Sequence, residues 1–152
     1  VSAGPTLTYT TPTGSPLTAT LANITTQNFD VAYSSYFDLT VGNGTNPANL
    51  SVGQSSTNNP LDGFTMQMTS GSGTVTSLVV TGSTDFTSTN IPTDGVKVWR
   101  DLGTVGVYDS GVDVQISSAS TAIASNATTV TISSEAVTTT LQNYLVTVYI
   151  TA

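Results

Sequence analysis

The sequence predicts an all-β fold, a single β-sandwich of the immunoglobulin-like or jelly-roll type. Apolar and polar residues alternate with a period of two along most of the chain, and helical periodicity is nearly absent. Serine and threonine fill 50 of the 152 positions, and β-branched threonine suits the half-exposed surface of a sheet. Glycine, proline and asparagine clusters separate the alternating runs, as turns do between the short strands of a sandwich.

About ten alternating runs follow one another along the chain. The clearest of them places Phe64, Met66 and Met68 on one face of a strand, with Thr65 and Gln67 on the other. The expected strands cover residues 7–9, 17–21, 29–33, 37–41, 64–68, 74–81, 95–100, 112–117, 128–133 and 144–150. The last is apolar on both faces, which predicts a central strand. A helical turn is allowed only within residues 134–143, where three consecutive threonines disfavour it.

Charge is scarce and almost entirely negative. Lys97 and Arg100 face eight aspartates and Glu135, which gives a net charge of -7. Two cations cannot neutralise the phosphates that nucleic-acid binding requires, and an anionic membrane surface is disfavoured for the same reason. No run of apolar residues is long enough to span a bilayer. We therefore expect no nucleic-acid partner and no membrane insertion.

The chain contains no cysteine and no histidine. A serine–histidine–aspartate triad, a zinc site with imidazole ligands and a thiol nucleophile are therefore excluded. We expect a protein without enzymatic activity. The chain begins at Val1 rather than at methionine, which predicts a mature form whose leader has been removed, and we expect an extracellular protein at the cell surface.

The N-terminal segment, residues 1–22, differs from the rest of the chain, residues 23–152, which we expect to form the sandwich. It is rich in threonine and proline and carries no charge. One interpretation makes it an ordinary first strand of the sandwich. The other makes it a donor strand that completes the sheet of a neighbouring copy, with the C-terminal strand lining the receiving groove. The expected interface residues are Leu7, Tyr9, Leu17 and Leu21.

Three aspartates recur within a glycine-rich stretch. Asp101, Asp109 and Asp113 alternate with glycines at positions 103, 106 and 111. Carboxylates gathered by tight turns are the ligands that calcium prefers, so these three are candidate calcium ligands. The spacing fits an EF-hand loop poorly, and the alternative is that the aspartates cap the backbone of a tight hairpin.

The run from Val96 to Asp113, VKVWRDLGTVGVYDSGVD, resembles a segment of immunoglobulin-like modules in large prokaryotic surface proteins. It departs from that pattern at Leu102 and Val105, where polar residues are common in the modules. The short chain, the missing cysteine and the threonine-rich N-terminus are also similar to subunits of donor-strand filaments, such as TasA-like biofilm fibres and archaeal pili and threads. This second resemblance implies an extracellular structural subunit that polymerises with itself.

Four sequons are candidate glycan attachment sites, at Asn23, Asn43, Asn49 and Asn126. The alternative function is that of an adhesin or a carbohydrate-binding module. Its platform would be formed by aromatic residues at positions 33, 36 and 37, or by Trp99 and Tyr108 beside the aspartate stretch. For Trp99, packing in the core beneath the loop is the favoured interpretation.

Overall fold

The computed structural model describes residues 6–10, 16–20, 39–48, 53 and 55–151. The chain divides into two compact units, Val1–Ser34 and Ser35–Ala152. The expected boundary after residue 22 falls within residues 21–38, which lie outside the described part, as does the expected strand at 29–33.

The first unit contains a β-hairpin. Strands β1 (Thr6–Thr10) and β2 (Pro16–Thr20) pair with each other in antiparallel register. Both alternating runs near the N-terminus are therefore strands, joined across the proline- and glycine-containing stretch that the sequence marks as a turn.

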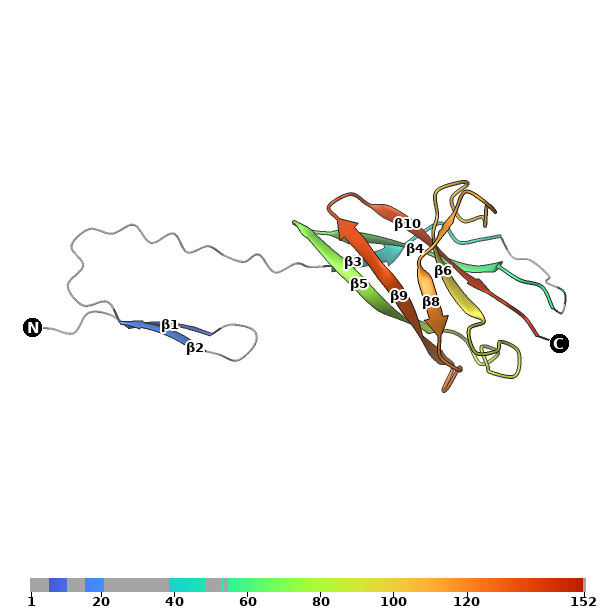
Figure 1. Cartoon of the computed structure of the whole chain (residues 1–152), viewed down its shortest axis with the longest axis horizontal. Coiled ribbons are helices and arrows are strands. Elements are labelled where there is room, and N and C mark those ends of the chain that lie inside the picture. Colours follow the sequence, from blue (N-terminus) through green and yellow to red (C-terminus); the bar gives the residue numbers. More distant parts are fainter. Residues whose placement is uncertain (1–5, 11–15, 21–38, 49–52, 54, 152) are drawn as a thin grey trace, which may run out of the picture. The chain divides into compact units, whose positions relative to one another are not determined.

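The second unit is a β-sandwich of two antiparallel sheets that lie face to face (Figure 1). The five-stranded sheet has the order β3-β4-β10-β6-β7, with β3 (Leu39–Asn43), β4 (Asn59–Met68), β10 (Gln142–Val148), β6 (Val96–Arg100) and β7 (Val114–Gln115). The three-stranded sheet has the order β5-β9-β8, with β5 (Ser72–Thr81), β9 (Ala127–Thr138) and β8 (Ser117–Ser120). The predicted all-β sandwich is confirmed.

The core lies between the two sheets. Tyr144, Val146 and Val148 of β10 face Val130, Ile132 and Val137 of β9 across it, and all six are buried. β10 lies between β4 and β6, which confirms the predicted central strand. The outward positions Leu145 and Thr147 are also fully buried, so loops cover the centre of this sheet on its outer face.

Two local details are settled by the structure. Residues 134–143 form no helical turn, as the three threonines suggest: β9 continues to Thr138, because Glu135 and Val137 point into the core and hold the segment in the sheet. The expected single strand at 112–117 is split, since β7 pairs with β6 in one sheet and β8 pairs with β9 in the other. The chain crosses between the sheets at Ile116, whose side chain is buried.

Candidate assembly surface and aspartate loop

One side of the sandwich is closed by hydrogen bonds from β6 to β8 and to Ile116, which directly precedes β8. The amides of Val98 and Val96 donate to the hydroxyls of Ser117 and Ser120, at 3.0 and 3.3 Å. The amide of Ile116 donates to the carbonyl of Val98 at 2.9 Å. Serine side chains thus replace part of a backbone ladder, and the two sheets are joined along this side.

The opposite side is open. Its borders are the edge strands β3 and β5, and within the described residues no backbone hydrogen bond joins them. Leu39 pairs with Met68 and Val41 with Met66. Directly paired residues share one face of a sheet, so Leu39 and Val41 occupy the core face. Nevertheless they are 39% and 57% exposed, whereas Met66 and Met68 are buried.

The three-stranded sheet ends before it covers β3. Residues Val75, Leu78 and Val80 of β5 pack against the core but remain half-buried. Strand β5 spans ten residues without a charge or a proline. Charged residues and proline are the usual means by which a protein protects an edge strand from pairing with another chain. Among the residues that the structure describes, no strand pairs with the second edge of β5 and the core face of β3 is exposed. We call this edge and this face the open side.

The hairpin carries the predicted interface residues in a regular arrangement. Tyr9 pairs with Leu17, so the register brings two of the predicted positions opposite each other on neighbouring strands, while Leu7 pairs with Ala19. Leu21 lies outside the described residues. The C-terminal strand, which we expected to line a receiving groove, does not border the open side: the core-facing residues of β10 are buried, and β4 separates β10 from β3.

The three aspartates do meet in one loop, where Asp113 is the central acceptor. Its Oδ1 accepts hydrogen bonds from the amides of Leu102 and Gly103, at 3.0 and 3.3 Å. Its Oδ2 accepts from the amide of Asp109 at 2.8 Å. Both oxygens are therefore occupied by the backbone of the loop that they fold.

The other two aspartates repeat this behaviour. Oδ2 of Asp109 accepts from the amide of Thr104, and Oδ2 of Asp101 accepts from the amide of Gly106 at 2.7 Å. Gly106 has a φ of 84°, which favours glycine at this position. The contacts match the alternative in which aspartate and glycine build a tight turn. The described residues hold no group of three acidic side chains suited to a metal ion, and calcium binding stays a prediction.

Asp101 retains one unusual atom. The residue is 5% exposed, and its Oδ1 has no hydrogen-bond partner among the described residues. Burial raises the pKa of this carboxyl, the amide of Gly106 opposes the rise, and the neighbouring carboxylates of Asp113 and Asp109 add to it.

A second buried carboxylate is fully paired. Glu135 of β9 accepts two hydrogen bonds from Arg100 of β6, at 2.9 and 2.6 Å, and one from the hydroxyl of Tyr144 at 2.9 Å. This bidentate pair raises the pKa of Arg100, and burial beside Glu135 raises the pKa of Tyr144. The network joins the two sheets and is structural. The sequence does not indicate this network, because its members lie far apart along the chain.

Two sequons lie within the described residues. Asn43 ends β3 and is exposed. The amide nitrogen of Asn126, the atom that a glycan modifies, donates to the carbonyls of Ser83 and Phe86 at 2.6 and 3.4 Å. Asn23 and Asn49 lie outside the described residues. Asn43 is thus the better-exposed of the two described candidates.

The aromatic residues near the loop are packed together. Trp99 is 8% exposed, packs against Tyr108 with the two rings tilted and their centroids 4.8 Å apart, and donates from Nε1 to the hydroxyl of Thr147 at 2.8 Å. Trp99 is therefore buried beside the loop, as the favoured interpretation expects, but on the outer face of the five-stranded sheet, which it shares with its pair Leu145. The other predicted platform, at positions 33, 36 and 37, lies outside the described residues.

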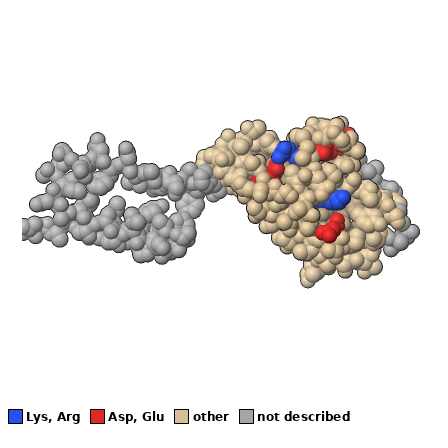
Figure 2. Space-filling view, in the orientation of Figure 1, with Lys and Arg blue, Asp and Glu red and all other residues tan. Residues whose placement is uncertain are grey.

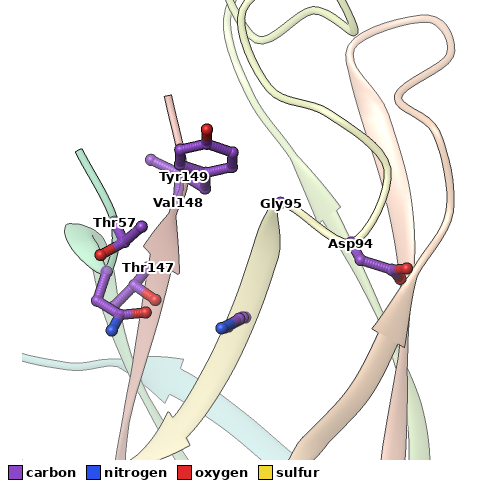
Figure 3. A pocket seen from close by; sticks show the side chains of 8 residues that line it. Thr57, Asp94, Gly95, Thr147, Val148 and Tyr149 are labelled. Atoms are coloured by element: carbon purple, nitrogen blue, oxygen red, sulfur yellow. The ribbon is translucent and has the colours of Figure 1, made fainter. Parts of the chain in front are cut away.

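A shallow hollow lies beside the start of β6 and the end of β10 (Figure 3). Asp94, Thr147 and Tyr149 contribute to its walls. Its volume is about 130 Å³, below the roughly 300–1,000 Å³ that small-molecule sites usually offer. The hollow is therefore small for a small-molecule site.

Comparison with protein families, with characterised proteins and with solved structures finds no match to this chain. The candidate function consequently depends on the geometry of the open side and of the hairpin.

Proposed function

We propose that this protein is a structural subunit of an extracellular filament, pilus or surface layer, in which identical subunits assemble by β-strand complementation. The observation that supports this function is the asymmetry of the sandwich. Its β6–β8 side is closed by hydrogen bonds, while its β3–β5 side leaves core-facing Leu39 and Val41 exposed.

A strand added at the open side would gain two kinds of stabilisation. Its main chain would pair with an edge that now lacks a partner strand, and its apolar side chains would cover the exposed core face. Because each subunit offers one donor segment and one acceptor, the contact is head-to-tail and can extend without closing. The polymer would bury the edges that make a free subunit prone to association.

The division of the chain supports a donor in the N-terminal unit. The buried core residues lie between positions 66 and 148, and the hydrogen bonds that close the β6–β8 side belong to the sandwich as well. The first unit, Val1–Ser34, is a separate compact unit that contains the strands β1 and β2. In the proposed assembly these strands are given to a neighbouring copy.

The surface agrees with a role outside the cell, in a biofilm or in adhesion. The face shown in Figure 2 is dominated by uncharged residues, with isolated charged side chains. Hydroxyl groups solvate such a surface with little dependence on pH or salt. The described part of the chain contains no apolar helix of membrane-spanning length.

Deleting residues 1–20 tests the proposal. We expect the complete chain to form long polymers, visible by negative-stain electron microscopy, that resist dissociation by detergent. The truncated chain should remain monomeric in size-exclusion chromatography and retain its β-sheet circular dichroism, because the core residues that the structure describes lie in the sandwich. Polymers formed equally well without residues 1–20, or a complete chain that stays monomeric at every concentration, would refute strand donation by this segment.

A further inference from the structure

We infer that the donated element is the whole β1–β2 hairpin, which adds to the free edge of β5 in a second copy and covers Leu39 and Val41. The inference rests on the proposed function and specifies its contact. It replaces a single inserted strand by a two-stranded unit.

The register of the hairpin supports this inference. Pairing of Leu7 with Ala19 and of Tyr9 with Leu17 gathers apolar positions on one face. The alternate pairs are Thr6 with Thr20, Thr8 with Thr18 and Thr10 with Pro16. One face of the hairpin is thus apolar in sequence and the other is dominated by threonine.

Such a hairpin needs another surface. An isolated two-stranded hairpin is marginally stable in water, and a third strand or a packed face is required for stability. The open side offers both, because β5 has a free edge and β3 has an uncovered apolar face. Neither contact requires the β1–β2 pairing to break.

The number of strands fits the addition. The sheet that contains β5 has three strands and the sheet opposite has five, so a hairpin would bring the smaller sheet to five. The neighbour of β5 would be β1, because each of its residues has an amide hydrogen, whereas β2 begins with Pro16. The threonine face would then continue the solvent-exposed face of β5, which carries Thr74 and Val79.

A disulfide across the hairpin distinguishes a donated hairpin from a donated single strand. The chain has no cysteine, so T8C/T18C introduces only one pair, at positions that the register places opposite each other. We expect the oxidised variant to polymerise at the rate and to the length of the reduced variant. Single T8C and T18C variants control for the substitutions themselves.

A mixing experiment locates the acceptor edge. T8C protein is mixed with V79C or T74C protein and oxidised during assembly, and linked peptides are identified by mass spectrometry. We expect a disulfide between Thr8→Cys of one chain and a β5 cysteine of another. S118C is the matched control, because Ser118 is exposed on β8, the opposite edge of the same sheet.

The outcomes separate the two proposals. Assembly of the reduced variant but not of the oxidised one would overturn the hairpin and leave single-strand donation intact. Links to S118C, or no link to either β5 position within polymers, would overturn the β5 edge, including the case in which each hairpin binds its own chain. Failure of the unmodified chain to polymerise would refute the proposed function itself.

Discussion

Asp101 carries one carboxylate oxygen that accepts a hydrogen bond from Gly106 and another that is buried without a partner. Burial raises the pKa of this carboxyl. An ionised carboxylate is costly in such a position, because a buried acceptor without a partner loses its hydration and gains no hydrogen bond in return. The residue thus stabilises the loop through one oxygen and destabilises it through the other.

Because the pKa of Asp101 is raised in the folded protein, the effect of D101N on the free energy of unfolding should depend on pH. The aspartate of the unfolded chain titrates near 3.8 and that of the folded chain at a higher pH. The stability that protonation contributes is therefore complete below 3.8 and is lost as the pH rises through the folded pKa. At pH 7 we expect D101N to be more stable than the original protein by about 1 kcal/mol, since the buried charge is removed.

Urea unfolding of D101N and of the original protein at neutral and strongly acidic pH measures this effect. The difference should shrink toward zero in acid, where both side chains are neutral. D62N is the control, because Asp62 is exposed and its replacement should change little at either pH. An equal gain at both pH values, or none at neutral pH, would contradict the prediction.

At the scale of the element, the edge strands β8, β5 and β3 differ in length, in bonding to the opposite sheet and in the exposure of their core-facing side chains. β8 is short and is tied to β6 through serine hydroxyls, whereas β5 is long and uncharged and β3 exposes its core-facing side chains. The open side is therefore a property of two particular strands. Strand addition should be sensitive to a charge placed there and insensitive to charges elsewhere.

A comparison of the variants V41D and L102D tests this sensitivity to charge. The two side chains are similarly exposed, at 57% and 54%, so neither change should unfold the protein. V41D would require a carboxylate to be buried beneath the added hairpin, and we expect its critical concentration for assembly to rise by at least about tenfold. Sedimentation of polymers measures that concentration. Normal assembly of V41D, or equal inhibition by L102D, would contradict a contact at β3.

The alternation of apolar and polar residues predicted most strands, because it depends only on residues that are neighbours in the sequence. The run around Met66 was placed correctly because its strand buries alternate residues against the opposite sheet, and the run around Val146 because a strand apolar on both faces lies at the centre of a sheet. The open side could not be predicted in this way. Leu39 and Val41 alternate just as buried residues do, and their exposure depends on how far the facing sheet extends, which distant strand pairing decides.

The aspartate loop shows a similar limit. Glycine and aspartate spacing predicted that Asp101, Asp109 and Asp113 would meet in a turn, and they do. The same spacing of aspartates is compatible with carboxylates that bind a cation and with carboxylates that accept hydrogen bonds from backbone amides. Only the directions of the Leu102, Thr104 and Gly106 amides, which depend on the folded backbone, show that the carboxylates accept hydrogen bonds from the loop itself.

For the whole molecule, scarcity of charge is the dominant property. Charged residues form 7% of the chain, and neither the hairpin strands nor β5 contain one. Subunits with a net charge of -7 repel one another weakly at long range, and salt would reduce that repulsion. Apolar burial and main-chain pairing would supply the attraction, and neither depends on ion pairs.

Polymers should therefore tolerate high ionic strength. Between about 0.05 M and about 1 M NaCl, where the screening length falls to a few ångströms, we expect the polymerised fraction measured by sedimentation to stay constant or to rise. Dissociation at the higher concentration would show that ion pairs hold the subunits together, and would contradict an interface made by β5, β3 and the hairpin.

The location of the two cations on β6 has a consequence for persistence outside the cell. A protease that cleaves after basic residues has only Lys97 and Arg100 to recognise in the entire chain. Both lie within a strand flanked by β10 and β7, and Arg100 is held by Glu135. Because a protease must draw its substrate into an extended, unpaired conformation, trypsin-like enzymes would find no accessible cleavage site until the sandwich unfolds.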